Sequence, residues 1–441
     1  MCKTAKMSSS QIILLSFGAA ILSGALLLMQ PFCTADGQGV SFTDALFTSA
    51  SAVCVTGLVV FDTASHWSLW GKAVIVLLIQ LGGLGVVTTA ILFSAMPRKQ
   101  ISLRQRNLLQ ESVQAVKVSG AMRFLRFVYL SAFTVEAVGA LWLTPVFIPE
   151  HGLLKGAALS CFYAVSAFCN AGFDLTGCRA PFSSLTSYAA CPLLNAVIML
   201  LIIIGGIGFN TLADFRKHRF NLRRYTLQSK LSLYVSAILI VCPAILFYGC
   251  EFGGLQGPER LLVSLFQSVT ARTAGFNTAD LNSMSQAGLM LMIFLMLTGG
   301  SPGSTAGGIK TTTLAVLTVS AISVFRQGKD ASIFGRRISA ETVRQALAVL
   351  LIYAVVFFSA SLLISRLEQA PVLTAMFEAA SAVGTVGLTL GITPQLSAAS
   401  KLIIIFLMYF GRVGGLTLMF AATPVDSKAL IQYPEEDLNV G

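Results

Sequence analysis

Charged side chains are scarce in this sequence. Asp, Glu, Lys and Arg make up 11% of the 441 residues, and only 19 residues are acidic. Because about a quarter of the residues in a soluble domain are charged, this composition excludes an ordinary soluble protein. Instead, 55% of the residues are hydrophobic, the mean hydropathy is +0.79, and apolar runs long enough to cross a bilayer recur along the chain. The sequence therefore predicts one polytopic membrane domain.

Side chains that bind metals or catalyse proton transfer are also few. The nine cysteines form no CxxC pair, the three histidines are scattered, and carboxylates are nearly absent from the apolar runs. This pattern predicts neither a zinc site nor a disulfide framework. Since an enzyme such as a membrane phosphotransferase needs a cluster of such groups, we predict that the protein is not an enzyme.

The basic residues that are present gather in three segments. Segments 97–126, 216–230 and 326–344 hold seven, six and five Lys or Arg, which is 18 of the 30 in the chain. They are short connections between apolar runs, so the positive-inside rule predicts that all three are cytoplasmic. A nucleic-acid partner is not expected, because no soluble fold presents these charges.

Four stretches of the sequence share one pattern. They are FTSASAVCVTGLV (47–59), FYAVSAFCNAGFD (162–174), LFQSVTARTAGFN (265–277) and FEAASAVGTVGLT (377–389). They align on Gly57, Gly172, Gly275 and Gly387, which are 115, 103 and 112 positions apart. A large apolar residue stands ten positions before each glycine and a bulky residue directly follows it. A lone glycine in an apolar run usually serves helix packing, but four at equivalent places indicate a repeated unit.

Each repeat has the same three parts. A long apolar run comes first, a segment too short to span follows and ends near the aligned glycine, and a second long run completes the unit. The fold class that we predict is an all-α polytopic membrane protein with eight spanning helices and four half-helices around one central pore. The predicted divisions are repeat 1 (1–97), repeat 2 (98–217), repeat 3 (218–329), repeat 4 (330–420) and a cytoplasmic tail (421–441).

The four glycine loops have the chemistry of a cation filter. Non-helical backbone is tolerated at membrane depth only where it is buried in protein or lines a cavity. Glycine can take a positive φ, so loop carbonyls can turn towards a common axis and replace the hydration shell of a potassium ion. The predicted potassium ligands are Val55, Thr56, Gly57, Asn170, Ala171, Gly172, Thr273, Ala274, Gly275, Thr385, Val386 and Gly387.

With the filter loops VTGLV, NAGFD, TAGFN and TVGLT, the chain resembles the Trk/Ktr/HKT potassium transporter superfamily over nearly its whole length. Its eight predicted spans make it most similar to the membrane subunit of a bacterial Ktr system. The resemblance implies potassium selectivity set by the four glycines, whereas some plant members with serine in the first loop favour sodium. Only TVGLT approaches the TVGYG sequence of tetrameric potassium channels, so the degree of discrimination stays open.

The stretch GGSPGSTAGGIKT, residues 299–311, interrupts the second apolar run of repeat 3. The equivalent runs carry glycine pairs that begin at Gly82, Gly205 and Gly411. From the first glycine to the following threonine there are six steps at Gly82–Thr88 and twelve at Gly299–Thr311, so repeat 3 has about six additional residues. A phosphate-binding loop is one alternative, but Ile309 separates the glycine from the lysine and no strand precedes. A plain kink without function is another.

We interpret this stretch as a loop that obstructs the pore beneath the filter. Arg412 follows the aligned Gly411, and a charged side chain at this depth is expected to face the pore or a partner. The family resemblance implies the same gate. The gate residues are Gly299, Gly300, Ser301, Pro302, Gly303, Ser304, Thr305, Ala306, Gly307, Gly308, Lys310 and Arg412. A structural ion pair of Arg412 with Glu136 remains an alternative, and Lys310 either shares the gating role or reaches the cytoplasmic interface.

The outer connections carry more acidic than basic residues, Glu378 among the acidic ones, which favours cations at the pore mouth. Asp174 and Asn277, two residues after their glycines, are the candidates for the pore entrance. A sodium-coupled transporter of an organic solute is the alternative function, since broken helices and repeats also occur there.

The resemblance also implies partners and a location. It implies a homodimer in the bacterial inner (plasma) membrane and a cytosolic ring of nucleotide-binding regulatory subunits. The basic segments and the eight predicted spans place both termini in the cytoplasm. On this reading potassium is the bound ion, sodium is a candidate activator, and any nucleotide binds only to the partner subunit.

Overall fold

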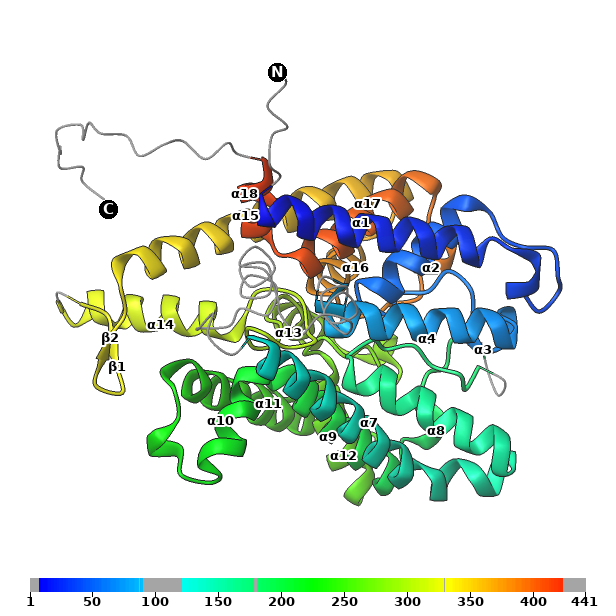
Figure 1. The fold of residues 1–441 in the computed structure, drawn as a ribbon, viewed down its shortest axis with the longest axis horizontal. Helices are drawn as coiled ribbons and strands as arrows, with labels where there is room; N and C mark the ends of the chain where they lie inside the picture. Colours follow the sequence, from blue (N-terminus) through cyan, green and yellow to red (C-terminus); the bar gives the residue numbers. More distant parts are fainter. Residues whose placement is uncertain (1–7, 87, 90–120, 178–180, 329, 423–441) are drawn as a thin grey trace.

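The computed structural model describes residues 8–86, 88–89, 121–177, 181–328 and 330–422, and these are almost entirely helical (Figure 1). The only sheet in these ranges is an antiparallel hairpin of β1 (Ser332–Ile333) and β2 (Arg336–Arg337). Most of the predicted basic segment 97–126 and nearly all of the predicted tail 421–441 lie outside the described residues.

Four long apolar helices begin the four predicted repeats. They are α1 (Ser9–Leu28), α7 (Ala121–His151), α11 (Leu227–Cys250) and α15 (Ala340–Glu368). Among the described helices these are the ones long and apolar enough to cross a membrane without a break. Side chains on one face of each are exposed, as Leu141 and Leu351 are, which suits a surface in contact with lipid.

A short helix follows each long helix. The four are α2 (Phe42–Val53), α8 (Leu153–Phe168), α12 (Gly257–Thr270) and α16 (Val372–Gly384). At 12 to 16 residues they are too short to span, and their last turns are buried among other helices. Small residues such as Ala50, Ala164 and Ala380 allow this close packing.

The returning helices are α4 (Leu69–Leu84), α9 (Pro192–Ile207), α13 (Gln286–Leu297) and α17 (Ala398–Val413). The chain then continues as α10 (Phe209–His218), α14 (Thr311–Phe325) and α18 (Gly415–Ala422). The remaining short elements are α3 (Thr63–His66) and the 3₁₀ helices η1 (Pro31–Cys33), η2 (Thr186–Tyr188), η3 (Leu222–Arg224), η4 (Leu281–Ser283) and η5 (Thr393–Gln395). Serine hydroxyls cap the starts of three returning helices, at Ser68, Ser285 and Ser397.

The returning helices break more sharply than the sequence predicts. Gly85, Gly208 and Gly414 have φ values of 90°, 94° and 92°, and each lies three residues after the first glycine of its pair. Glycine adopts such angles without a Cβ penalty. The bend between α9 and α10 is 96° and that between α17 and α18 is 94°, so α10 and α18 leave the direction of the bundle.

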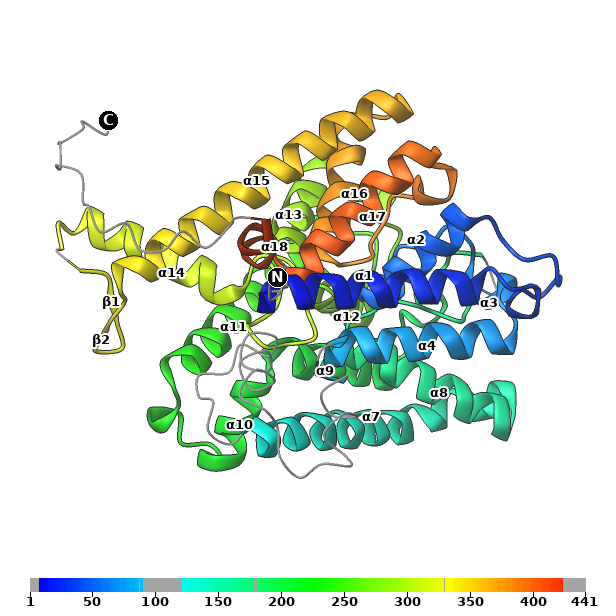
Figure 2. The ribbon, with the colours of Figure 1, turned by 45° about the horizontal axis from the view of Figure 1, so that its top comes forward.

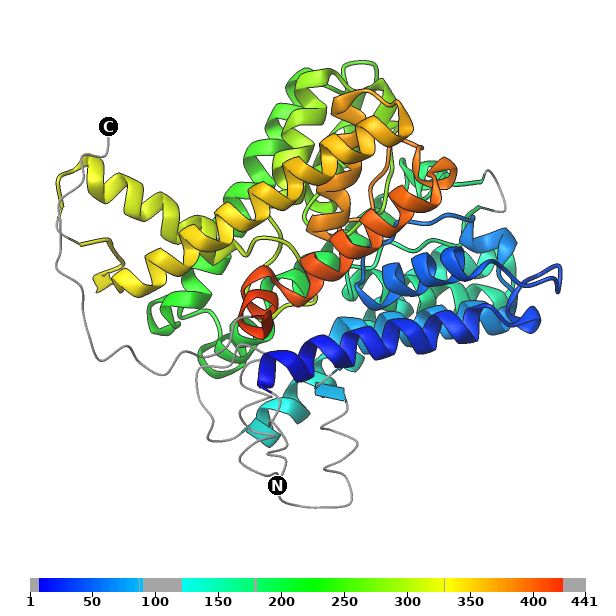
Figure 3. The same ribbon diagram turned by 90° about the horizontal axis from the view of Figure 1, so that it is seen from above.

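The helices pack in a closed cycle. Each returning helix contacts the short helix of the next repeat: α4 contacts α8, α9 contacts α12, α13 contacts α16, and α17 returns to α2. An ion pair of 2.7 Å between Lys401 on α17 and Asp44 on α2 joins the last repeat to the first. The short helices therefore surround a common centre (Figure 2). The α14 helix, the hairpin and the first half of α15 project from this bundle (Figure 3).

Candidate functional site

The loops after the short helices have an unusual backbone. Two residues before each aligned glycine, the φ values of Val55, Asn170, Thr273 and Thr385 are 58°, 59°, 68° and 52°. The φ values of Gly57, Gly172, Gly275 and Gly387 are 91°, 68°, 82° and 97°. In each loop two residues with positive φ therefore flank one residue with an ordinary backbone conformation. This arrangement lets successive carbonyls turn to the same side of the loop.

The four glycines close a ring. A β-carbon added to each one would collide with the carbonyl oxygen of the middle filter residue of the next repeat. The pairs are Gly57 with Ala171, Gly172 with Ala274, Gly275 with Val386 and Gly387 with Thr56. The structure thus brings together all twelve residues predicted for the filter. No side chain fits at the glycine positions without displacing a carbonyl of the adjacent loop.

Hydroxyl groups in the short helices support the ring from behind. Ser51 and Ser381 accept hydrogen bonds of 3.0 Å from the backbone N–H groups of Gly57 and Gly387. Ser166 and Thr270 donate hydrogen bonds of 2.9 and 2.6 Å to the carbonyls of Phe173 and Phe276. These four hydroxyl residues were not predicted from the sequence. A hydroxyl residue six positions before the glycine, or five in repeat 3, was the available signal.

A second layer of polar side chains holds the outer ends of the loops. Tyr163 accepts a hydrogen bond of 3.0 Å from the N–H of Leu175, and Gln267 donates one of 2.7 Å to Asn277. In repeat 4 the residue that binds the outer end of the loop is Glu378, which is fully buried. The sequence analysis placed Glu378 in the outer loops facing outside, and that placement is wrong because its carboxylate points back into the protein behind the filter.

The Glu378 carboxylate accepts a hydrogen bond from the Thr389 hydroxyl, one of 3.3 Å from the N–H of Leu390 and one of 3.0 Å from the Thr393 hydroxyl. Replacing Glu378 by alanine is expected to destabilise the protein by about 1–3 kcal/mol, because these buried donors lose their acceptor. Thermal unfolding of the purified protein measures this loss. Glu378→Gln keeps an acceptor oxygen and is expected to lose less stability. Equal unfolding midpoints for wild type and Glu378→Ala would contradict this role of Glu378.

The two candidate entrance residues differ in their surroundings. The side-chain oxygen of Asn277 accepts hydrogen bonds from Gln267 and from the N–H of Ala279, so its carboxamide stabilises the loop. Asp174 accepts a hydrogen bond of 3.0 Å from Thr176. Burial raises the pKa of Asp174 to about 6, and the nearby Asp62 carboxylate adds to this rise. Asp174 lies two residues after Gly172, at the end of that loop away from Asn170.

One buried charge lies beside the ring. Three positions before the filter glycine the repeats carry Cys54, Cys169, Arg272 and Gly384. Arg272 is 6% exposed and donates a hydrogen bond of 2.9 Å to the Ser236 hydroxyl of α11. No described carboxylate pairs with it. It follows the end of α12, where the helix dipole favours a cation, and the sequence analysis did not single it out.

The loop 299–311 lies against the predicted filter loops. The Thr305 hydroxyl donates a hydrogen bond of 3.1 Å to the carbonyl of Phe168, at the end of α8. On the opposite side, a β-carbon on Gly307 would collide with the Thr385 hydroxyl, and one on Gly308 would touch Gly384. The loop therefore contacts the inner ends of filter loops 2 and 4, which face each other in the cycle of repeats.

Backbone hydrogen bonds fix the loop to its neighbours. The N–H of Ser301 donates to the carbonyl of Gly206 at 2.9 Å, and that of Phe209 donates to the carbonyl of Gly303 at 2.9 Å. Both Gly206 and Phe209 flank the break between α9 and α10, where helix-terminal groups lack partners in their own helix. The loop follows helix α13 rather than a strand, so the structure gives no support to a phosphate-binding loop.

Arg412 joins the loop to repeat 1. Its guanidinium donates hydrogen bonds to the carbonyl of Thr305 and to the carbonyls of Gly82 and Gly83. The last two belong to the final turn of α4, where the carbonyl of Gly82 also accepts a hydrogen bond of 3.1 Å from the N–H of Gly85. The alternative ion pair with Glu136 is absent, because Glu136 instead accepts hydrogen bonds of 3.1 and 3.2 Å from Gln80.

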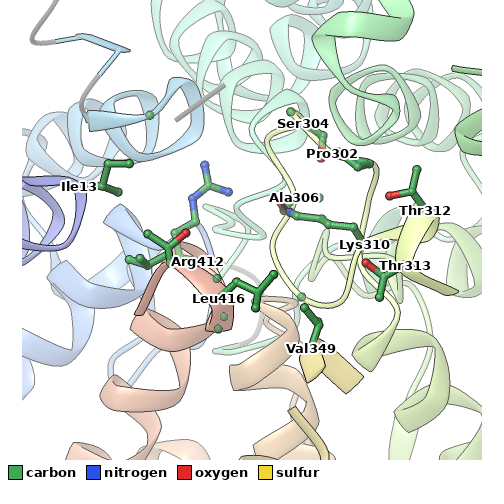
Figure 4. Close-up of a pocket in the computed structure, with 18 of the residues that line it drawn as sticks. Ile13, Pro302, Ser304, Ala306, Lys310, Thr312, Thr313, Val349, Arg412 and Leu416 are labelled. Carbon is green, nitrogen blue, oxygen red and sulfur yellow. Dashed lines mark hydrogen bonds between the residues drawn. The ribbon is translucent and has the colours of Figure 1, made fainter. Parts of the chain in front are cut away.

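A cavity of about 310 Å³ opens beneath the loop. Pro302, Ser304, Lys310 and Arg412 line it, and Figure 4 shows the two basic side chains beside the same loop. Lys310 donates a hydrogen bond of 2.7 Å to the carbonyl of Ala306, so it closes the loop on itself rather than reaching the interface. Loop backbone and the side chains of Lys310 and Arg412 thus lie together next to the predicted filter loops.

Proteins with a similar sequence identify the family of this chain. The family model TrkH, described as a cation transport protein, matches residues 3–433. The chain belongs to the TrkH family.

Relatives of this TrkH-family chain align over its full length. The potassium/sodium uptake protein NtpJ of Enterococcus hirae is 41% identical and covers 99% of this chain and 98% of its own. The Ktr system potassium uptake protein B of Bacillus subtilis is 38% identical, with 100% of this chain and 98% of the relative covered. These similarities confirm the family that the four glycine loops predicted.

A solved structure confirms the fold. The crystal structure of the potassium transporter TrkH from Vibrio parahaemolyticus matches with a TM-score of 0.76, covering 96% of this chain and 87% of that one, at 19% identity. The predicted all-α membrane fold of pseudo-symmetric repeats around one pore is therefore correct. This TrkH-family chain is a multi-pass membrane cation transport protein.

Proposed function

We propose that this protein takes up potassium across the plasma membrane by channel-like permeation through the four-loop carbonyl filter. The observation that carries the proposal is the ring in which each filter glycine packs against a carbonyl of the next repeat. Uniform carbonyl surroundings suit a monovalent cation that sheds its water. The relatives named as potassium uptake proteins support potassium as the main ion, and the name of NtpJ supports sodium as a second ion or activator.

We further propose that residues 299–311 and Arg412 form the gate. The described arrangement is then the closed one, because loop backbone lies under the filter and the guanidinium charge repels cations in a low-dielectric pore. Opening requires the loop to leave Thr385 and Phe168. Asp174 would attract cations at the outer mouth, whereas Asn277 stabilises its loop.

The remaining proposals concern assembly. Relatives named as proteins of a Ktr system support a multi-component transporter, and we propose a cytosolic nucleotide-binding ring as the regulatory partner and a homodimer of pore subunits. The repeat boundaries given above and the cytoplasmic position of both termini belong to the same proposal. No observation favours a sodium-coupled organic solute transporter. Such a transporter binds its solute where helices are broken, and here the backbone of loop 299–311 and Arg412 lie at that place.

Growth of a potassium-uptake-deficient bacterial strain at limiting potassium tests the proposed function. Expression of the wild-type protein is expected to restore growth, and a co-expressed regulatory subunit is expected to change the extent of rescue. Cells that express the Asp174→Asn variant are expected to need more external potassium for the same growth. Failure of the wild-type protein to restore growth or potassium uptake, when it is present in the membrane, would refute the proposal.

A further inference from the structure

A basic pocket lies away from the pore, between the start of α7 and the end of α10. Its volume is about 880 Å³, and it is lined by Arg123, Arg126, Arg216 and Lys217 together with apolar residues that include Phe127 and Leu130. The guanidinium of Arg216 lies 5.5 Å from the centre of the Phe127 ring. Four cations therefore surround one hollow whose wall is partly aromatic and aliphatic.

These cations have no carboxylate partner in the described part of the chain. Asp214 is the nearest acidic residue along α10, but its carboxylate accepts hydrogen bonds of 3.0 and 2.8 Å from the N–H and hydroxyl of Thr226. The repulsion among four clustered cations is thus uncompensated within the described residues. Such a cluster attracts an anion with several acceptor oxygens.

The pocket lies where the bilayer surface is expected. Arg123 and Arg126 are in the first turns of the long apolar helix α7, and Leu130, one turn further, is 66% exposed on its lipid side. The 96° bend turns α10 away from the direction of α9 (Figure 2). Phe215 and Phe220, 48% and 87% exposed, extend from the same region. Exposed aromatic and basic side chains together are typical of a segment in the membrane interface.

The helix that supplies half of these cations also holds the inner loop. α10 begins at Phe209, whose N–H donates a hydrogen bond of 2.9 Å to the carbonyl of Gly303. Two turns later the same helix presents Arg216 and Lys217 to the pocket. An occupant that draws α10 towards α7 therefore restrains the helix end that contacts the loop.

We propose that this pocket binds the headgroup phosphate of an anionic phospholipid, and that the bound lipid stabilises the closed position of residues 299–311. The second part rests on the gating function proposed above. Basic pockets between membrane helices on the cytoplasmic side bind such headgroups. A free phosphate ion would use only the cations, whereas an acyl chain also covers Phe127 and the exposed Leu130.

Lipid retention by the purified full-length protein tests the binding. Native mass spectrometry in detergent would compare phosphatidylglycerol with phosphatidylcholine of the same acyl chains. Wild type is expected to retain phosphatidylglycerol preferentially, and the double variant Arg126→Gln with Arg216→Gln is expected to lose roughly 30-fold in that preference. Arg223→Gln with Arg224→Gln, two exposed cations of η3 outside the pocket, serves as the matched control and is expected to keep the preference.

Potassium flux tests the coupling. In vesicles containing phosphatidylglycerol the Arg126→Gln, Arg216→Gln variant is expected to conduct several-fold faster than wild type, and in phosphatidylcholine vesicles the two are expected to be equal. Equal phosphatidylglycerol preference in wild type and variant would overturn the lipid site. A variant that keeps the lipid preference but no longer binds a cytosolic subunit would overturn it as well. Lost lipid with unchanged flux would overturn the coupling. The gate itself is judged separately, by flux through Arg412 variants in phosphatidylcholine alone.

Discussion

Arg412→Ala is expected to raise potassium flux in reconstituted vesicles by roughly tenfold to a hundredfold while leaving the preference for potassium over sodium nearly unchanged. The guanidinium holds Thr305 of the loop against Gly82 and Gly83 of α4. A hydrogen bond from a charged donor contributes about 1.5–3 kcal/mol, so losing these bonds shifts the loop towards open positions. A variant lacking residues 301–306 should act in the same direction, because it shortens the loop to the length found in the other repeats.

Arg412→Lys separates the two ways in which this residue can block ions. Lysine keeps the positive charge, but one ammonium group does not reproduce the planar fork that reaches two chain segments. Wild-type flux in Arg412→Lys would assign the barrier to charge, and high flux would assign it to the anchoring of Thr305. If neither Arg412→Ala nor the shortened loop raises flux at normal protein levels, the gate lies elsewhere.

Serine at any one of Gly57, Gly172, Gly275 or Gly387 is expected to lower the discrimination of potassium against sodium by roughly tenfold. A left-handed conformation costs a residue with a β-carbon about 1–2 kcal/mol, and the added atoms would also displace the carbonyl of the adjacent filter loop. A displaced carbonyl no longer matches the potassium ion. Competition between the two ions for uptake into vesicles measures the effect.

Gly391 offers a matched control for these variants. Its φ is +94°, close to that of Gly387, but a β-carbon there would meet nothing within 4 Å. Gly391→Ser therefore carries the backbone strain without the collision and is expected to keep its ion preference. Unaltered preference in all four filter variants would show that the ring does not select the ion.

Much of this architecture could be predicted because it is repeated. One glycine in an apolar run carries little information, but Gly57, Gly172, Gly275 and Gly387 at equivalent places defined the filter loops and the short helices before them. The basic segments led to the proposed orientation. The insertion in repeat 3 became visible only by comparing Gly299–Thr311 with Gly82–Thr88.

The contacts of individual polar side chains could not be predicted in the same way. Glu378 and Asn277 have polar side chains near the outer ends of loops, and only the folded chain shows that both turn inward to bind neighbouring groups. Each glycine pair offered several places for a break, so the sharp turns at Gly85, Gly208 and Gly414 were underestimated as mild bends. Arg412 and Glu136 are opposite charges, yet the carbonyls of Gly82 and Gly83 at the end of α4 accept the hydrogen bonds of the guanidinium instead.

The inner loop occurs once in the described residues, whereas the long helix, the short helix, the glycine loop and the returning helix each occur four times. A channel of four identical subunits must move four copies of its gate, and partial movement produces intermediate states. With the gate proposed above, a single displacement would open the whole pathway, so one pore would have no states in which only some copies of its gate have moved. Cooperativity in the assembled transporter would then have to arise between pores or within a regulatory partner, and not within the pore.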